Sequence, residues 1–159
     1  MAIDAFIKID SIEGESPDSK HGKEIQVLSF HFGADQPASS GVGGGAGVGK
    51  VQIHDLTFTH YVDKASPKLF VACATGAHIA KAVLSARKAG GDQQDYIIIT
   101  LTDVVVASVQ AAGSVEGLPS ETIGLNFTQI NFEYKEQNEK GALTGTVAGG
   151  FNVKTMKKV

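Results

Sequence analysis

The sequence has one cysteine, no tryptophan, four prolines and no long hydrophobic run. A single cysteine cannot form a disulfide within the chain, which is typical of proteins that fold in a reducing compartment. No stretch of about 18 apolar residues occurs, and the first residues lack the basic segment and apolar run of a cleaved signal peptide. We therefore expect no membrane insertion and no export through an ordinary signal peptide.

Charge of either sign is also scarce. Charged residues make up 19% of the 159 residues, with 14 basic and 17 acidic side chains and a net charge of −3. This balance provides no basic footprint for nucleic acid. Hydrophobic residues reach 42%, too many for a disordered chain, and a chain of this length can bury about 70% of its unfolded surface. We expect a single domain over residues 1–159.

Residues 63–76 carry the signals of a short helix in a chain that otherwise has strand patterns. Ser66 is a suitable N-cap, Pro67 suits the first helical position, and Gly76 suits the left-handed residue after the last turn. The helix is expected near residues 66–75. Its spacing predicts an inward apolar face that consists of Leu69, Phe70, Ala72 and Cys73.

Alternation of polar and apolar residues predicts strands over most of the remaining chain. In the second predicted strand the apolar phase shifts near Val27, which predicts a bulge or a change of packing layer. Strands joined by turn signals, together with one helix, indicate an all-β sandwich or barrel. The predicted strands span residues 3–12, 24–32, 51–62, 78–87, 95–109, 121–134 and 145–153.

A glycine-rich connection, residues 33–49, separates the second and third predicted strands. Its end, from Gly44 to Lys50, matches the spacing of a phosphate-binding loop. However, Val51 stands where that motif needs a hydroxyl residue, and a strand pattern follows instead of a helix. The dinucleotide-binding fingerprint fails for the same reason, because no βαβ unit surrounds the glycines. We expect no nucleotide cofactor.

No group of residues in the sequence has the spacing of a catalytic or metal site. His54 and His60 share a strand phase, but six residues of strand separate them by roughly 20 Å, too far to chelate one ion. Cys73 is expected to act as a small apolar residue. We expect no catalytic residues, metal or cofactor, although a site assembled from distant strands stays open. The carboxylates of the first loop are expected to be solvated: Glu13, Glu15, Asp18 and Glu24.

Read together, residues along the whole chain resemble the haemolysin-coregulated protein (Hcp) family, the tube subunit of the bacterial type VI secretion system. The sequence departs from many relatives at Phe30, Phe32 and Phe151, near which they carry tryptophan. The resemblance rests on segments in the same order: Phe6-Ile7-Lys8-Ile9, Gly14-Glu15-Ser16 with Asp18 and His21, Glu24-Ile25, Val27-Leu28, Gly49-Lys50, Leu56-Thr57-Phe58-Thr59, Asp63-Lys64 with Ser66-Pro67 and Leu69, Arg87-Lys88-Ala89-Gly90-Gly91, Tyr96, Ile98-Ile99-Thr100-Leu101, Leu125-Asn126-Phe127 and Tyr134.

The resemblance implies a β-barrel of two antiparallel sheets with one flanking helix. It further implies hexameric rings that stack into a hollow tube, assembly in the bacterial cytoplasm and secretion by a contracting sheath without a signal peptide. The implied partners are other copies of the chain, sheath and spike proteins of the apparatus, and effector proteins in the lumen. It implies no enzymatic activity.

From this geometry we hypothesise that Ser29 and His31 face the lumen, because a cargo channel should present small or polar groups. We also hypothesise that the glycine loop contacts a neighbouring subunit or ring. The alternatives are a phage tail-tube-like ring protein without a role in secretion, an enzyme or toxin formed through an added C-terminal domain, which is not expected here, and a monomeric binding module. The loop residues are Gly41, Gly43, Gly44, Gly45, Gly47, Gly49 and Lys50.

Overall fold

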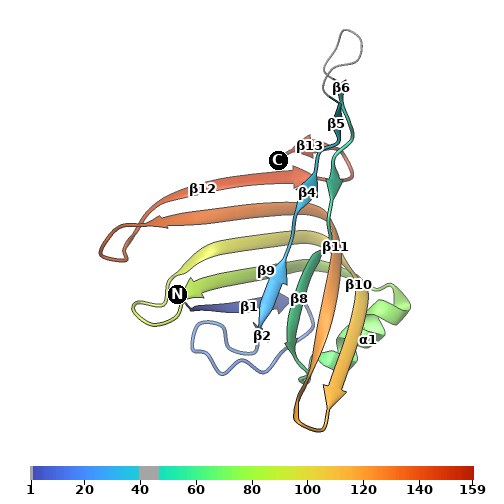
Figure 1. Cartoon of the computed structure of the whole chain (residues 1–159), viewed down its shortest axis with the longest axis vertical. Helices are drawn as coiled ribbons and strands as arrows, with labels where there is room; N and C mark the ends of the chain where they lie inside the picture. The colour runs from blue at the N-terminus through green and yellow to red at the C-terminus, as the bar shows by residue number, and fades with distance from the viewer. Residues whose placement is uncertain (1, 40–46) are drawn as a thin grey trace.

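The computed structural model of the protein describes residues 2–39 and 47–159, whose arrangement is shown in Figure 1. Strand makes up 60% of the described residues and helix 7%. All pairings between the named strands are antiparallel, and the predicted all-β class with one short helix is confirmed. The elements are β1 (Ile3–Ile9), β2 (Ile25–Val27), β3 (Ser29–His31), β4 (Ala34–Asp35), β5 (Ala38–Ser39), β6 (Gly47–Val48), β7 (Gln52–Ile53), β8 (Leu56–Tyr61), α1 (Ser66–Thr75), β9 (His78–Lys88), β10 (Asp95–Ser114), β11 (Gly117–Gln137), β12 (Leu143–Asn152) and β13 (Lys157–Lys158).

The main sheet curls back on itself to form a barrel. β1 pairs with β2 on one side and with β9 on the other, and the sheet continues through β10 and β11 to β8. The barrel closes because β3, which follows β2 directly, pairs with β8. The alternating apolar residues of these strands therefore point into one shared interior.

The strand that closes the barrel changes its partner at Leu28. The residues before it pair with β1, and the residues after it pair with β8. Leu28 itself donates its N–H to the carbonyl of Thr59 at 2.8 Å, and its side chain is exposed. The phase shift predicted near Val27 is confirmed, and the change of pairing partner is its cause.

β10 and β11 are much longer than the strands predicted from the sequence, with 20 and 21 residues. They pair along almost their whole length, with register shifts between Val106 and Ser108 and between Ala112 and Ser114. Asp103 has a positive φ of 58°. The N-terminal half of β11 pairs with β8 in the barrel, whereas its C-terminal half pairs with β12. The sheet therefore extends past the barrel, as the upper part of Figure 1 shows.

The single named helix has the predicted bounds, and Gly76 takes the left-handed conformation with φ of 63°. Two predicted details are wrong. Ala65 is the N-cap, and the Ser66 hydroxyl instead accepts the N–H of Asp63 at 3.0 Å, while the Asp63 carboxylate accepts the N–H of Ala65 at 2.8 Å. Phe70 points to solvent with 64% of its surface exposed, whereas Leu69 and Ala72 are buried and Cys73 packs against the core.

The core fills the barrel and reaches α1, which lies beside β10 (Figure 1). Fully buried side chains come from every wall: Ile7, Ile25, Leu56, Phe58, Leu84, Ile99, Leu101, Ile123, Leu125 and, from the helix, Leu69. Cys73 is only partly buried but packs against this cluster. A helix of ten residues is marginal alone, so its contact with the barrel is what stabilises it.

The described parts of residues 33–53 form an arm that leaves the barrel after β3 (Figure 1). β4 pairs with β7, and β5 pairs with β6. The strand predicted over residues 51–62 is two strands, β7 and β8, which are interrupted at His54 and Asp55. The N–H of His54 donates to the carbonyl of Gly33 at 2.9 Å, next to the β4–β7 pairing. The segment predicted as an unstructured connection has strand pairing in its described parts.

Candidate functional site

Ser29 and His31 lie on the outer face of the barrel, with their side chains exposed. Their cross-strand partners on β8 are Thr59 and Thr57, and the hydroxyls of Ser29 and Thr59 are 2.5 Å apart. The residue between them, Phe30, points the other way and packs on the core. The pattern of polar residues outward and aromatic residues inward agrees with the sequence prediction, while the lumen role of this face stays a prediction.

The same outer face continues across the neighbouring strands with small polar side chains. Thr122 lies opposite Thr59, and Asn126 donates its side-chain N–H to Asp55 at 2.9 Å. On the next strand Gln110 pairs with Thr122 and is exposed. We call this surface the polar face: Ser29, His31, Thr57, Thr59, Ser108, Gln110, Thr122 and Asn126.

Two histidines stand together where the polar face meets the arm. The rings of His31 and His54 are stacked with centroids 6.3 Å apart, and the Nε2 of His54 lies 2.7 Å from a carboxylate oxygen of Asp35. Within the described residues no group of three or more His, Cys, Asp or Glu side chains has the geometry of a metal site. The pair therefore marks the boundary between the polar face and the arm.

Some of the predicted loop residues are among those that the structure describes, and the others are not. Gly47 belongs to β6, Gly49 donates its N–H to the carbonyl of Pro37 at 3.1 Å, and Lys50 is exposed. A Cβ at position 49 would lie 2.5 Å from that carbonyl oxygen, so only glycine fits this crossing of the arm. Gly41, Gly43, Gly44 and Gly45 lie outside the described residues.

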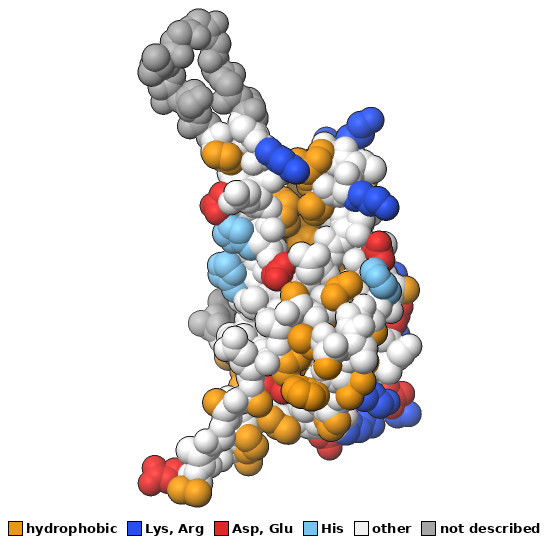
Figure 2. All heavy atoms as spheres, turned by 90° about the vertical axis from the view of Figure 1, so that its right-hand side faces the viewer, with side chains coloured by type: hydrophobic (Ala, Val, Ile, Leu, Met, Phe, Trp, Pro, Cys, Tyr) orange, Lys and Arg blue, Asp and Glu red, His pale blue; other side chains and the backbone are white. Residues whose placement is uncertain are grey.

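Large apolar side chains gather around α1, on the side of the molecule that Figure 2 shows. Phe70 and Val71 are 64% and 56% exposed. A groove of about 720 Å³ runs between the helix and the start of β9, and Ile12, Val71 and Ile79 contribute to its apolar lining. An exposed patch of this kind on a small domain is typical of a protein interface.

A second exposed apolar surface lies on the sheet extension. Phe132, Tyr134 and Val147 share one face of β11 and β12, where Tyr134 is directly opposite Val147, and all three are exposed. Along the barrel the corresponding face of β11 is buried in the core. Beyond the barrel it lacks such cover, so the extension presents apolar surface in the single chain.

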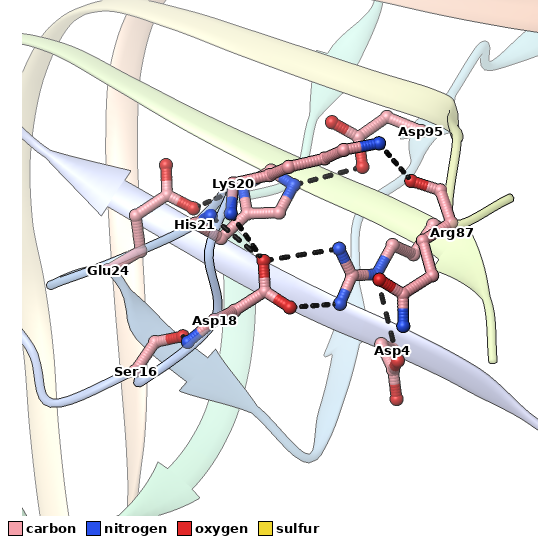
Figure 3. A network of polar contacts seen from close by, with 9 residues as sticks. Asp4, Ser16, Asp18, Lys20, His21, Glu24, Arg87 and Asp95 are labelled. Atoms are coloured by element: carbon pink, nitrogen blue, oxygen red, sulfur yellow. Dashed lines mark hydrogen bonds and ion pairs between the residues drawn. The ribbon is translucent and has the colours of Figure 1, made fainter. Parts of the chain in front are cut away.

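Residues of the first loop form a dense polar network against the barrel (Figure 3). Asp18 accepts two hydrogen bonds from the Arg87 guanidinium, one of them at 3.2 Å, and His21 contacts both Glu24 and Asp95. The Arg87 guanidinium holds the pKa of the Asp18 carboxyl well below its usual range. The expectation of a solvated loop is therefore wrong for Asp18 and Glu24.

This network covers an aromatic side chain on the outward phase of β1. Phe6 is only 2% exposed because the His21 ring stacks on it at 4.5 Å and the Arg87 guanidinium lies 5.0 Å from its centre. Gly14 allows the loop to approach, since a Cβ there would lie 2.5 Å from the carbonyl oxygen of Glu24. In the sequence, the one sign that a loop covers β1 is Phe6 itself, an apolar residue in the otherwise polar phase of this strand.

A buried hydrogen bond between two side chains links β8 to β11 near the start of the helix. The Nε2 of His60 lies 2.8 Å from Glu121, and both side chains are nearly inaccessible. The carboxylate of Asp63 lies 3.8 Å from the other ring nitrogen, and burial raises the pKa of Asp63, with Glu15 and Glu121 adding to the effect. His60 therefore lies between two carboxylates inside the fold.

The comparison with protein families decides the assignment. The sequence model described as "Type VI secretion system effector, Hcp" matches residues 6–134. The chain belongs to the Hcp family. It is 46% identical over 157 residues to "Protein hcp1" of Pseudomonas aeruginosa, and the match covers 97% of each chain.

Solved structures agree with this membership. The Hcp-family chain is 39% identical to Hcp1 from Salmonella typhimurium, with a TM-score of 0.83 and complete coverage of both chains. The solved structure of a type six secretion system protein gives a TM-score of 0.95 at 34% identity, covering 99% of this chain and 100% of that one. A type VI secretion system effector from Yersinia pestis gives 0.79 at 37% identity, covering 94% and 100%. In the described residues no helix is long and apolar enough to span a bilayer.

Proposed function

We propose that this chain is the tube subunit of a type VI secretion system. In this proposal residues 1–159 form one domain, six copies form a ring, and rings stack into a hollow tube that is assembled in the bacterial cytoplasm and then secreted. The tube carries effector proteins in its lumen and works with sheath and spike proteins. The observation that carries the proposal is that one Hcp-family chain presents a polar face and two separate exposed apolar surfaces.

Ring closure requires a heterologous interface, in which two different surfaces of the same chain meet. The apolar surface at α1, with Phe70 and Val71, and the surface on the sheet extension, with Tyr134 and Val147, supply two candidates on different elements. The helix contributes Lys68 and has no acidic residue in its first turn, whereas Glu136 shares the phase of Tyr134 on β11. Their charges are therefore complementary as well.

The polar face suits the wall of a channel. Hydroxyl and amide groups such as those of Thr59, Thr122 and Asn126 stay hydrated and give cargo no apolar surface to adhere to. We place Ser29 and His31 in the lumen for this reason. The arm with Gly47, Gly49 and Lys50 is assigned to contacts between subunits or rings because it extends beyond the barrel.

This role requires no catalysis and no cofactor. The clusters described above, at His21 and at His60, are held in internal contacts between side chains. A structural role for these groups explains their partners without a substrate. We therefore propose a structural and carrier protein that is not an enzyme.

Light scattering with negative-stain imaging of the same chromatographic peak tests the assembly. A molar mass near six subunits and ring-shaped particles are expected. A monodisperse monomer across micromolar concentrations would contradict the ring proposal. For the lumen, His31→Glu should change effector retention in a co-purification assay while ring mass stays constant, and Lys88→Glu, an exposed position away from the polar face, serves as the control.

A further inference from the structure

The loop of residues 13–24 is fastened to the barrel by two different sets of contacts, which Figure 3 shows side by side. One set is Asp18 with Arg87 of β9. The other is His21, which lies between Glu24 at the start of β2 and Asp95 at the start of β10. Both sets cover Phe6.

The His21 contacts have an unusual requirement for protons. Its Nδ1 contacts an oxygen of Glu24, and its Nε2 lies 3.0 Å from an oxygen of Asp95. An ionised carboxylate can only accept hydrogen bonds, and a neutral imidazole has a single N–H to donate. Both hydrogen bonds therefore form together only when the group of three holds one additional proton.

That proton has two possible positions. It makes His21 an imidazolium between two carboxylates, or it resides on Glu24, which then donates to Nδ1 while Nε2–H donates to Asp95. Burial raises the pKa of Glu24, which favours retention of the proton in the folded loop. The other charged groups that face this cluster are Lys8 and Asp4 of β1, Asp18 and Lys20 of the loop, and Arg87 of β9.

The Asp18 contacts have no such requirement. The ionised Asp18 accepts from the Arg87 guanidinium and from the backbone N–H groups of Lys20 and His21, at 2.9 and 3.0 Å. All these donors keep their protons at neutral and alkaline pH. This half of the attachment is therefore insensitive to a rise in pH.

We propose that residues 13–24 form a proton-dependent latch. The latch is closed while one proton is bound among His21, Glu24 and Asp95, and its His21 side opens when a rise in pH removes that proton. Opening uncovers Phe6 and frees the turn after β9, to which Lys20 is bonded through the carbonyl of Gln93 at 3.2 Å. Asp18 and Arg87 keep the loop tethered, so the change is local and reversible.

The direction of the pH effect follows from linkage. The closed loop binds one more proton than the open loop, so acidification favours closure and alkalinity favours opening. The population of the open form rises by at most about tenfold per pH unit, because a single proton is released. Glu24→Gln and His21→Gln separate this mechanism from simple loosening of the loop.

Trypsin cleavage after Lys20 and Lys23, measured from pH 6 to 9 on the full chain, reports opening. Each rate is divided by that of an unstructured peptide with the same residues, which removes the pH dependence of the protease. The wild-type ratio should rise with pH. Glu24→Gln should be slow at every pH, because its amide donates to Nδ1 without an additional proton, and His21→Gln should be fast at every pH.

His78→Gln, at an exposed histidine on β9, is the matched control and should follow the wild type. Proton-detected NMR of the imidazole ring gives a second reading: His21 should lose its second ring N–H over the same pH range in which cleavage increases. A flat wild-type ratio, or a rise of the same size in Glu24→Gln, would overturn the latch. Ring mass recorded at each pH keeps this result separate from the assembly proposal.

Discussion

Asp18 and Arg87 are 69 positions apart in the sequence, and their side chains meet through paired hydrogen bonds. The guanidinium does two tasks at once, since it also lies over the ring of Phe6. A lysine could supply the charge but not the planar fork or the stacking. The pair therefore joins the first loop to the strand β9 and closes the layer over β1.

Arg87→Gln should lower the midpoint of thermal unfolding by several degrees, because it leaves the Asp18 carboxylate without its counter-charge and uncovers Phe6. Lys88→Gln is the control, since Lys88 is adjacent and exposed. The midpoint of thermal unfolding of Arg87→Lys should fall between those of Arg87→Gln and Lys88→Gln. Equal midpoints for Arg87→Gln and Arg87→Lys would show that a positive charge at this position does not by itself stabilise the fold.

Leu69 and Phe70 are neighbours on α1 with opposite environments, at 0% and 64% exposure. Leu69→Ala should reduce the free energy of unfolding by about 2–5 kcal/mol, as expected for a cavity in a packed core. Phe70→Ala should change it by less than about 0.5 kcal/mol, yet weaken the proposed ring. Denaturant titration and light scattering measure the two effects, and a strong loss of stability in Phe70→Ala would place this side chain in the core instead.

Glu121→Ala should destabilise the fold by about 3–5 kcal/mol, because it leaves His60 buried beside an empty space without its partner. Glu121→Gln keeps an acceptor for the imidazole N–H and should lose less. Glu116→Ala, an exposed position in the turn that precedes the same strand, should be within about 0.5 kcal/mol of the wild type. Urea unfolding at neutral pH gives all three values.

Asp63 provides a test of pH dependence. Burial raises its pKa, so the folded state binds this proton more tightly than the unfolded chain, and the ionised group lowers stability once the pH exceeds the folded-state pKa. Asp63→Asn should therefore be more stable than the wild type at pH 7, and this advantage should shrink on acidification. The amide oxygen still accepts the N–H of Ala65. Denaturant unfolding curves at pH 7 and at pH 4 measure the difference in stability between the variant and the wild type. An Asp63→Asn variant that is less stable than the wild type at pH 7 would contradict the prediction.

The features that were predicted correctly from the sequence are those that local patterns determine. Pro67 and Gly76 placed the helix correctly because proline and a left-handed glycine restrict the backbone by themselves. Ser66 was misassigned because its hydroxyl accepts the N–H of Asp63, while the Asp63 carboxylate accepts the N–H of Ala65. Sequence spacing alone does not distinguish this arrangement from an N-cap. Phe70 was misassigned because a ten-residue helix offers too few turns to separate a core face from an exposed apolar one.

The polar network could not be predicted, because its members come from distant strands. His21 meets Asp95 across 74 positions, and no periodicity connects them. The sequence did contain one trace of it, an apolar Phe6 on the otherwise polar side of β1. A single large residue in the wrong phase indicates that something covers it, but not which loop does so.

The position of β1 in the sheet constrains the order in which the chain can fold during its synthesis. β1 is made first, yet seven of its residues pair with β9, whose residues lie 73 to 85 positions later. Contacts so distant in sequence close slowly. On the ribosome, the apolar side chains of β1 therefore have only the short β2 as a strand partner until more than half of the chain has emerged. This interval is when the nascent chain has most need of a chaperone.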